Sequence, residues 1–285
     1  RLTELLVESV QKADPEVDFA QYDVVIVFHA GVGQDFAITL DPTPYDILSA
    51  FMNKDDLKAS LAPNDSDFQG IPVENGTAFV DCGLILPESE NHLLYDNWAE
   101  VFGESDSPCH YQFGLNGTLA FMFGFYLGLP CLFDTESGMT GIGKFGLMDQ
   151  GSANLSGLVP AAPCAWERVF LGWETPVVAK NFEDVVLKKV GSASDTTVWK
   201  IPINANEYFL VENRCAHFRP GVSFDSLQYR IYMENGMVEL PLSFPLIRDS
   251  LKAEFSPETG VMLSVPHYDY GLEGSGLLIW HIDES

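Results

Sequence analysis

The stretch from Gly117 to Asp149 reads GTLAFMFGFYLGLPCLFDTESGMTGIGKFGLMD and contains the longest apolar run of the 285-residue chain. Residues 119–127 are apolar nearly all round, which predicts a helix enclosed by the core on every side. Gly128 is placed to end this helix in the left-handed conformation, and Pro130 cannot continue it. Asn116 is the expected N-terminal cap. The stretch therefore predicts a buried helix followed by glycine-rich loops.

The order of residues in this stretch resembles the active-site helix and following loops of secreted zinc metalloproteases of the immune inhibitor A family. That family has a sequence close to AHEFGHxLGLPDLYD, followed by SGIGxWxLMD. Here Phe121 and Phe125 stand in the places of the two histidines. Met122 stands in the place of the glutamate, and Cys131 in that of the acidic residue after the Gly-Leu-Pro turn. The resemblance implies an α+β, zincin-like fold: a mixed sheet with a buried former active-site helix, followed by a β-rich portion.

These replacements remove the chemistry of the family's site. In H-E-x-x-H, two histidines one helical turn apart bind a zinc ion, and the glutamate takes a proton from the zinc-bound water. Phe121 and Phe125 have no lone pair for a metal, and the thioether of Met122 cannot act as a general base. The resemblance thus implies an inactive enzyme, or pseudoprotease, without a catalytic zinc. Leu147-Met148-Asp149 resembles the methionine turn below the zinc site, whose role is structural.

A second candidate region precedes this helix in the chain. Residues 23–29 are rich in β-branched side chains and predict a buried strand that runs into a glycine-rich turn. The same protease family has such a strand before a similar turn. The resemblance therefore implies that the former substrate cleft, lined by residues 29–46 and by the face around Phe121, is where a peptide would bind. Its candidate residues are His29, Gly31, Gly33, Asp41 and Tyr45.

Three carboxylates in the glycine-rich loops are candidate calcium ligands, because calcium prefers oxygen donors. They are Asp134, Glu136 and Asp149. Related proteases bind calcium, and no other cofactor is expected. The alternative is that these carboxylates cap backbone amides within their loops.

Composition excludes several classes of function. The 41 acidic residues outnumber the 15 basic ones and give a formal net charge of −26. Nucleic-acid binding is not expected, because phosphate contacts need lysine and arginine. A membrane span is not expected either, since the longest apolar run is short and broken by glycine and proline. Hydrophobic residues make up 46% of the chain, which is enough for a globular core.

The pattern of the chain changes near residue 176. Before it, we expect a zincin-like protease-type domain at 1–175, with helices at its start and at 163–173. After it, period-two alternation predicts a β-rich portion at 176–285. The expected strands cover residues 185–190, 196–201, 207–212, 229–233, 261–266 and 276–282. Both ends of the chain suggest a piece of a longer precursor, secreted or held at the cell surface.

The sequence therefore predicts a pseudoprotease with a binding or assembly role outside the cell. Its partner would be a peptide, another protein, or further copies of the chain. One alternative is an active metal-dependent peptidase with displaced ligands. Another is a purely structural subunit of an extracellular assembly.

Overall fold

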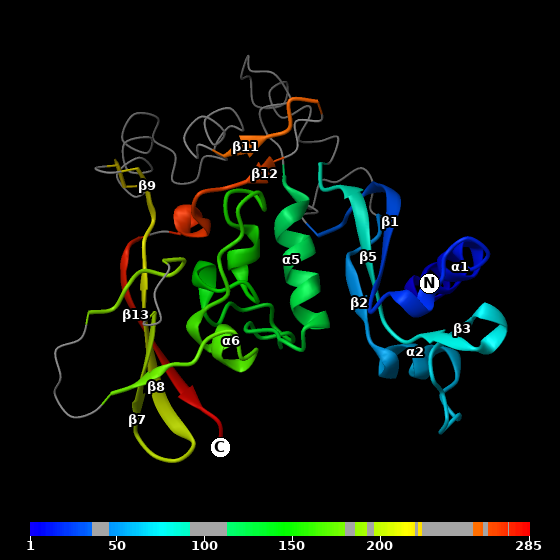
Figure 1. Ribbon diagram of the computed structural model, residues 1–285, viewed down its shortest axis with the longest axis horizontal. Coiled ribbons are helices and arrows are strands. Elements are labelled where there is room, and N and C mark those ends of the chain that lie inside the picture. The colour runs from blue at the N-terminus through cyan, green and yellow to red at the C-terminus, as the bar shows by residue number, and fades with distance from the viewer. Residues whose placement is uncertain are drawn as a thin grey trace. The chain divides into compact units, whose positions relative to one another are not determined.

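The computed structural model describes residues 1–35, 46–91, 113–179, 186–192, 197–219, 222–223, 253–258, 262–272 and 274–285. The chain forms two compact units, Arg1–Pro108 and Cys109–Ser285 (Figure 1). Each unit combines helices with small sheets, so the predicted α+β class is confirmed. Among the described helices, none has the length and apolar character needed to cross a membrane.

The first unit contains a three-stranded sheet in the order β1-β5-β2. The central strand β5 (Gly83–Ser89) pairs in parallel with β1 (Val25–Val32) and antiparallel with β2 (Ala50–Met52). Leu84, Ile85 and Leu86 on β5 are fully buried. The strand expected at residues 23–29 is thus present as β1, at the edge of the sheet that the described residues form. Its predicted burial is wrong, because Ile26 and Phe28 are 37% and 55% exposed at this edge position.

Helices cover this sheet because their apolar side chains need a core. Helix α1 (Leu2–Ala13) buries Leu6 and Val10, which pack in one cluster with Ile85 of β5. Helix α2 (Lys54–Leu61) was not predicted, although Asn53 and Asp56 form a capping box at its start. A hairpin of β3 (Ile71–Val73) and β4 (Ala78–Val80) completes this unit, with the short helical turn η2 (Glu74–Gly76) between its strands.

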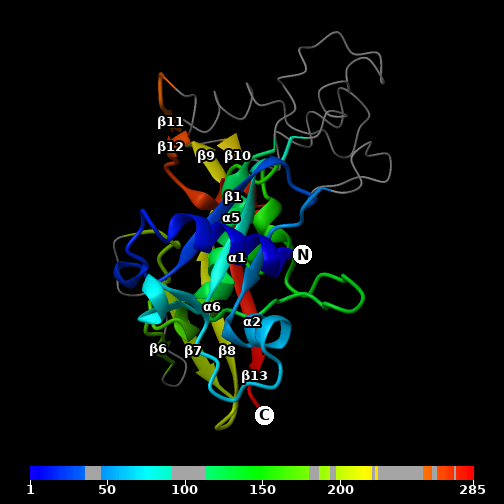
Figure 2. The ribbon, with the colours of Figure 1, turned by 90° about the vertical axis from the view of Figure 1, so that its right-hand side faces the viewer.

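The second unit is organised around a four-stranded sheet in the order β13-β8-β7-β6. Figure 2 shows these strands side by side, with helix α6 (Ala165–Phe170) close to them. The inner face of the sheet packs with α6 in a cluster of Ala165, Val198, Tyr208 and Leu210. The strands are β6 (Val177–Val178), β7 (Val198–Pro202), β8 (Glu207–Arg214) and β13 (Gly276–Asp283).

The remaining elements of the second unit are short, apart from helix α5 (Leu115–Tyr126). Two-residue and three-residue strands form the hairpins β9–β10 and β11–β12. Their bounds are β9 (His217–Arg219), β10 (Val222–Ser223), β11 (Glu254–Phe255) and β12 (Met262–Ser264). The 3-10 turns are η1 (Phe19–Gln21) in the first unit and η4 (Gly143–Phe145), η5 (Gln150–Ala153) and η6 (Tyr268–Gly271) in the second.

The compact units differ from the predicted division of the chain at residue 175. That position lies inside the second unit, because α6 contacts β8 and shares a core with the sheet. Of the expected strands, those at 196–201, 207–212 and 276–282 are confirmed as β7, β8 and β13. The strand expected at 185–190 is wrong for its described part, where Lys189 makes only an isolated bridge to Asn213. The strand expected at 229–233 lies outside the described residues.

Candidate functional site at helix α5 and Met148

Helix α5 places the two aromatic residues of interest on one face. The rings of Phe121 and Phe125 meet edge to face with their centroids 4.9 Å apart, and Phe133 stacks on Phe121 at 6.3 Å. The predicted end of the helix is confirmed, since Gly128 has a φ of 90°. The predicted cap is wrong: the helix starts after Gly114, and the side chain of Asn116 instead donates a hydrogen bond to Leu158 O.

Residues 119–127 are less enclosed than predicted, since Met122 and Gly124 are buried and the others are partly exposed. Met122 is 8% exposed, whereas Phe121 and Phe125 are partly buried at the border of an apolar cluster. The closest packing is made by Gly117 and Gly124, because small residues let a helix approach its neighbours. The prediction of a helix enclosed on every side is therefore wrong, while its apolar contact face is real.

The residues below α5 belong to the segment that resembles a methionine turn. Leu147 and the fully buried Met148 form the apolar cluster with Leu129, against which Phe121 and Phe125 pack. A Cβ atom on Gly124 would overlap Sδ of Met148, so helix and turn are in close contact at this point. The structure thus brings positions 121, 125 and 148 together in one apolar cluster.

The backbone of Met148 is held from two sides. Its N–H donates to Oε1 of Glu167 at 2.9 Å, and its carbonyl accepts from the N–H of Leu132 at 2.9 Å. Glu167 lies on α6 and also accepts from the N–H of Cys164. Burial raises the pKa of this carboxyl, and the backbone donors oppose the rise. The turn below α5 is therefore tied to the helix that packs on the sheet.

Asp149 organises the glycine-rich loop through its carboxylate. Oδ2 accepts hydrogen bonds from the hydroxyl of Thr140 and from the N–H groups of Gly141, Ile142 and Gly143, at 2.7–2.9 Å. Burial raises the pKa of Asp149, but these hydrogen bonds lower it more, and its pKa lies below the usual value. With so many donors aimed at it, this oxygen caps the loop instead of offering a lone pair to a cation.

The other two candidate calcium ligands are arranged differently. Asp134 accepts from the hydroxyl of Ser137 and from the N–H groups of Glu136 and Ser137. These bonds, the hydroxyl first, lower the pKa of Asp134. Within the described residues, no group of three or more His, Cys, Asp or Glu side chains could hold a metal ion. The carboxylates of Asp134 and Asp149 thus accept hydrogen bonds within their own loops, and calcium binding stays a prediction. Cys131 is a partly buried free thiol, and burial raises its pKa.

The expected cleft residues lie in the first unit, on and after β1. The N–H of Gly31 donates to Oε1 of Glu88 at 2.9 Å, and that of Gly33 donates to Ser89 O at 2.9 Å. Nδ1 of His29 lies 3.0 Å from Ala30 O. Asp41 and Tyr45 lie outside the described residues. What the structure shows here is a strand edge held to β5, and the prediction of a peptide-binding cleft stays a prediction.

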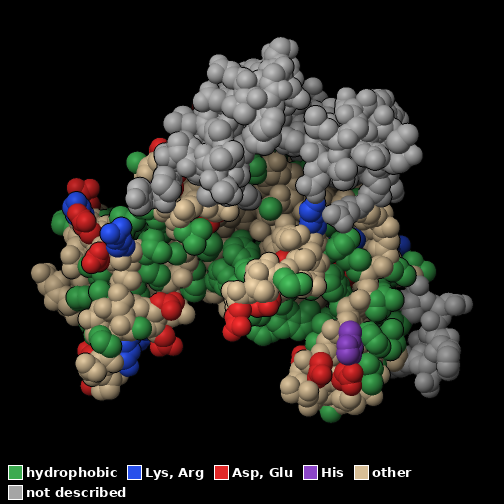
Figure 3. Space-filling model, turned by 180° about the vertical axis from the view of Figure 1, so that it is seen from behind, with side chains coloured by type: hydrophobic (Ala, Val, Ile, Leu, Met, Phe, Trp, Pro, Cys, Tyr) green, Lys and Arg blue, Asp and Glu red, His purple; other side chains and the backbone are tan. Residues whose placement is uncertain are grey.

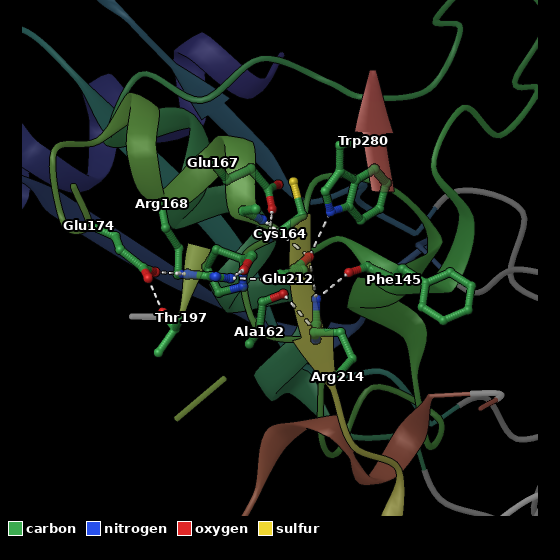
Figure 4. A network of polar contacts seen from close by, with 12 residues as sticks. Phe145, Ala162, Cys164, Glu167, Arg168, Glu174, Thr197, Glu212, Arg214 and Trp280 are labelled. Carbon is green, nitrogen blue, oxygen red and sulfur yellow. Dashed lines mark hydrogen bonds and ion pairs between the residues drawn. The ribbon is translucent and has the colours of Figure 1, made fainter. Parts of the chain in front are cut away.

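Sequence reasoning missed a buried charged network in the second unit. Glu212 of β8 is fully buried and accepts from Nη1 of Arg168 at 3.1 Å and from Nε1 of Trp280 at 2.8 Å. Figure 4 shows Glu212 between these two side chains. Arg168 also pairs with Glu174 at 2.8 Å. A single carboxylate thereby joins α6, β8 and β13.

Arg214, two residues further along β8, extends this network. Its guanidinium contacts Oδ1 of Asp269 at 2.7 Å and donates to Phe145 O at 2.9 Å and to Oε1 of Glu212 at 3.4 Å. Arg214 and Asp269 are 1% and 0% exposed. The signal in the sequence is the pair of charges at alternate positions of a strand, Glu212 and Arg214, which must share a face. Because that face is the buried one, the charges are paired inside the fold and are not open to a ligand.

Comparison of the chain with protein-family models, with curated proteins and with solved structures finds no match.

Proposed function

We propose that this chain is a catalytically inactive relative of secreted zinc metalloproteases, with a binding or assembly role outside the cell. The observation that supports it best is the pairing of α5 with the turn at Met148. Phe121 and Phe125 are one helical turn apart, on the face that packs over this turn. Two histidines at these positions would share one metal ion, and two phenyl rings cannot.

The loss of the catalytic base supports the same reading. Met122 stands at the position that the resemblance gives to the glutamate, and it is buried. A thioether does not take up a proton at neutral pH, so a zinc-bound water would have no base here. The partner that we propose is a peptide or a protein, including further copies of the chain. Calcium is not required by this proposal, since Asp134 and Asp149 bind their own loops.

The direct test measures metal content and peptidase activity of the purified native protein. We expect no stoichiometric zinc in elemental analysis and no cleavage of casein that a chelator such as EDTA abolishes. Calcium alone would leave the proposal standing. Stoichiometric zinc together with chelator-sensitive cleavage would overturn it in favour of a peptidase with displaced ligands.

A restored variant tests the role of the apolar face. The triple change Phe121→His, Met122→Glu and Phe125→His should destabilise the protein by a few kcal/mol, roughly the cost of burying polar groups without partners. The matched control is the triple change to leucine at the same positions, which keeps the face apolar. Thermal melting in the presence of EDTA compares the two. Equal melting temperatures for the histidine variant and the wild type would show that these positions are not packed.

A further inference from the structure

Strand β13 has two chemically distinct sides. It pairs antiparallel with β8 without interruption, from Gly276 opposite Arg214 to Asp283 opposite Glu207. Leu278, Trp280 and Ile282 turn toward the core, and Trp280 reaches the buried network. The alternate residues Leu277 and Ile279 turn outward and are 62% and 67% exposed. Large aliphatic side chains are therefore presented to solvent along this strand.

Among the described residues of the sheet, the same alternate residues direct their backbone groups away from β8. The N–H of Glu284 donates to Asn206 O at 2.9 Å, in register with the ladder between β13 and β8. In an antiparallel ladder, a residue directs both its N–H and its C=O to the same side, and its neighbours direct theirs to the opposite side. Even-numbered residues of β13 thus bond to β8. Odd-numbered residues direct their groups away from β8; they are Leu277, Ile279, His281 and Asp283.

The hydrogen bonds between β8 and β7 confirm this assignment of odd- and even-numbered residues. The N–H of Ile203 donates to Glu207 O at 2.9 Å, in register with the pairing of β7 and β8. Odd-numbered residues of β8 therefore bond to β7, which leaves even-numbered ones for β13. Because β13 is the outermost of the described strands of this sheet, its outward groups lie at an edge.

The outer face next to this edge is apolar as well. One row of apolar side chains crosses the four strands. Ile279 of β13 pairs with Val211 of β8, Val211 pairs with Trp199 of β7, and Trp199 pairs with Val177 of β6. Figure 3 shows patches of hydrophobic side chains next to acidic ones at the surface. An antiparallel sheet usually exposes a polar face to water, and a larger apolar area indicates a binding surface.

Between Leu277 and Ile282, this edge lacks three features by which proteins block strand pairing. Residues 277–282 contain no proline and no lysine, and their register with β8 has no bulge. At the other edge of the sheet, β6 has only two residues. An eight-residue strand in regular register, with Leu277 and Ile279 exposed on it, is a template for another extended segment.

The charges around β13 favour one kind of partner. Glu207 lies 2.8 Å from Nε2 of His281, Asp283 is exposed beside them, and Glu284 accepts from the hydroxyl of Tyr208. This end of the strand is therefore acidic, in a chain whose formal net charge is −26. A second copy would bring like charges together, whereas a cationic segment would be attracted.

We propose that β13 binds an extended, cationic segment of another protein, which adds as an antiparallel strand to its free edge. The segment would have apolar side chains at alternate positions, against Leu277 and Ile279, and lysine or arginine at its N-terminal end, beside the exposed carboxylate of Asp283. Antiparallel pairing is the more stable arrangement per residue. This proposal does not depend on the loss of peptidase activity.

The probe is a synthetic peptide of two lysines followed by alternating valine and threonine, and the control peptide has glutamates in place of the lysines. Binding is measured by calorimetry and should weaken with added salt. Ile279→Pro removes an outward N–H without removing a bond to β8, and should weaken binding roughly tenfold by losing a hydrogen bond and blocking close approach. Ile279→Thr keeps the N–H and should bind more tightly than the proline variant.

Hydrogen exchange on the wild-type protein keeps the test independent of how the variants fold. The peptide should slow exchange at the amides of Leu277, Ile279, His281 and Asp283, and leave their even-numbered neighbours unchanged. The absence of binding, equal binding of both peptides, or protection elsewhere would overturn the proposal. Self-association that Ile279→Pro abolishes, seen by sedimentation, would also overturn it, because the occupant would then be a second copy.

Discussion

Two parts of the second unit have cores of opposite chemistry. Around α5, the positions at which the resemblance expects two histidines and a glutamate hold Phe121, Met122 and Phe125. Phe121 and Phe125 pack against the cluster of Met148, and Met122 is buried. Around β8, Glu212 and Arg214 are buried with their charges, at positions for which the sequence suggested no special role. The difference teaches that buried charge alone does not identify a reactive site, because partners and access decide what a charged group can do.

The two cores also restrict the fold in different ways. Apolar packing is not directional, so the cluster around Met148 depends on volume. Hydrogen bonds to Glu212 are directional, so the donor groups of Arg168 and Trp280 must both point at its carboxylate. Replacing such a network with apolar residues can be neutral, but removing one partner leaves a buried charge without compensation. This contrast leads to predictions of different size for the two regions.

The largest effect is expected from Arg214→Met. The change leaves Asp269 without its cation and Glu212 with one donor fewer, and should lower the free energy of unfolding by about 3–5 kcal/mol. Lys188→Met removes an exposed cation of the same unit and should stay within about 0.5 kcal/mol. Urea denaturation followed by far-ultraviolet circular dichroism measures both. A cost for Arg214→Met no larger than that of the control would show that the network contributes nothing to stability.

The next effect tests the apolar core. Gly124→Ala adds a methyl group that would overlap Sδ of Met148, and should cost about 1–3 kcal/mol by overpacking. Met148→Ala makes a cavity and costs stability on its own. In the double variant the added methyl has room, so its cost should largely disappear. A double-mutant cycle from thermal melts gives the coupling, and strict additivity would mean that helix and turn are not in contact.

Local patterns in the sequence were enough to predict the helices and strands that are determined by residues close to each other in the sequence. The helix at α5, its end at Gly128, and the strands β8 and β13 follow from spacing within a few residues. The capping box of Asn53 and Asp56 was a local signal too, and could have revealed α2.

The buried network could not be predicted in the same way, because its contacts join distant parts of the chain. Arg214 reaches Asp269 and Phe145, which lie 55 and 69 residues away. Glu212 and Trp280 are 68 residues apart. The alternation of Glu212 and Arg214 shows that they share a face, but only the pairing of β8 with β13 and α6 shows that this face is buried. The candidate site was predictable where it depended on α5, and less so where it depended on loops.

The smallest expected effect concerns the glycine-rich loop between α5 and the turn at Met148. The size of this effect should depend on pH. Asp149→Asn keeps the shape of the side chain but removes the negative charge that accepts from Gly141, Ile142 and Gly143. Hydrogen bonds to a charged acceptor are stronger than neutral ones, so the variant should be less stable than the wild type by about 1–2 kcal/mol at pH 7.

The sign of the pH dependence follows from the lowered pKa of Asp149 in the folded state. A carboxyl with a lowered pKa stabilises the fold above its unfolded pKa of about 3.9, and this contribution is lost as pH falls through the folded value. The difference between wild type and Asp149→Asn should therefore be constant from pH 7 to pH 5 and shrink below about pH 4. Urea denaturation at several pH values measures it, with Glu258→Gln as an exposed control from the same unit. If the difference does not change down to pH 3, Asp149 is not the titrating group that holds this loop, and the glycine-rich segment depends on packing alone.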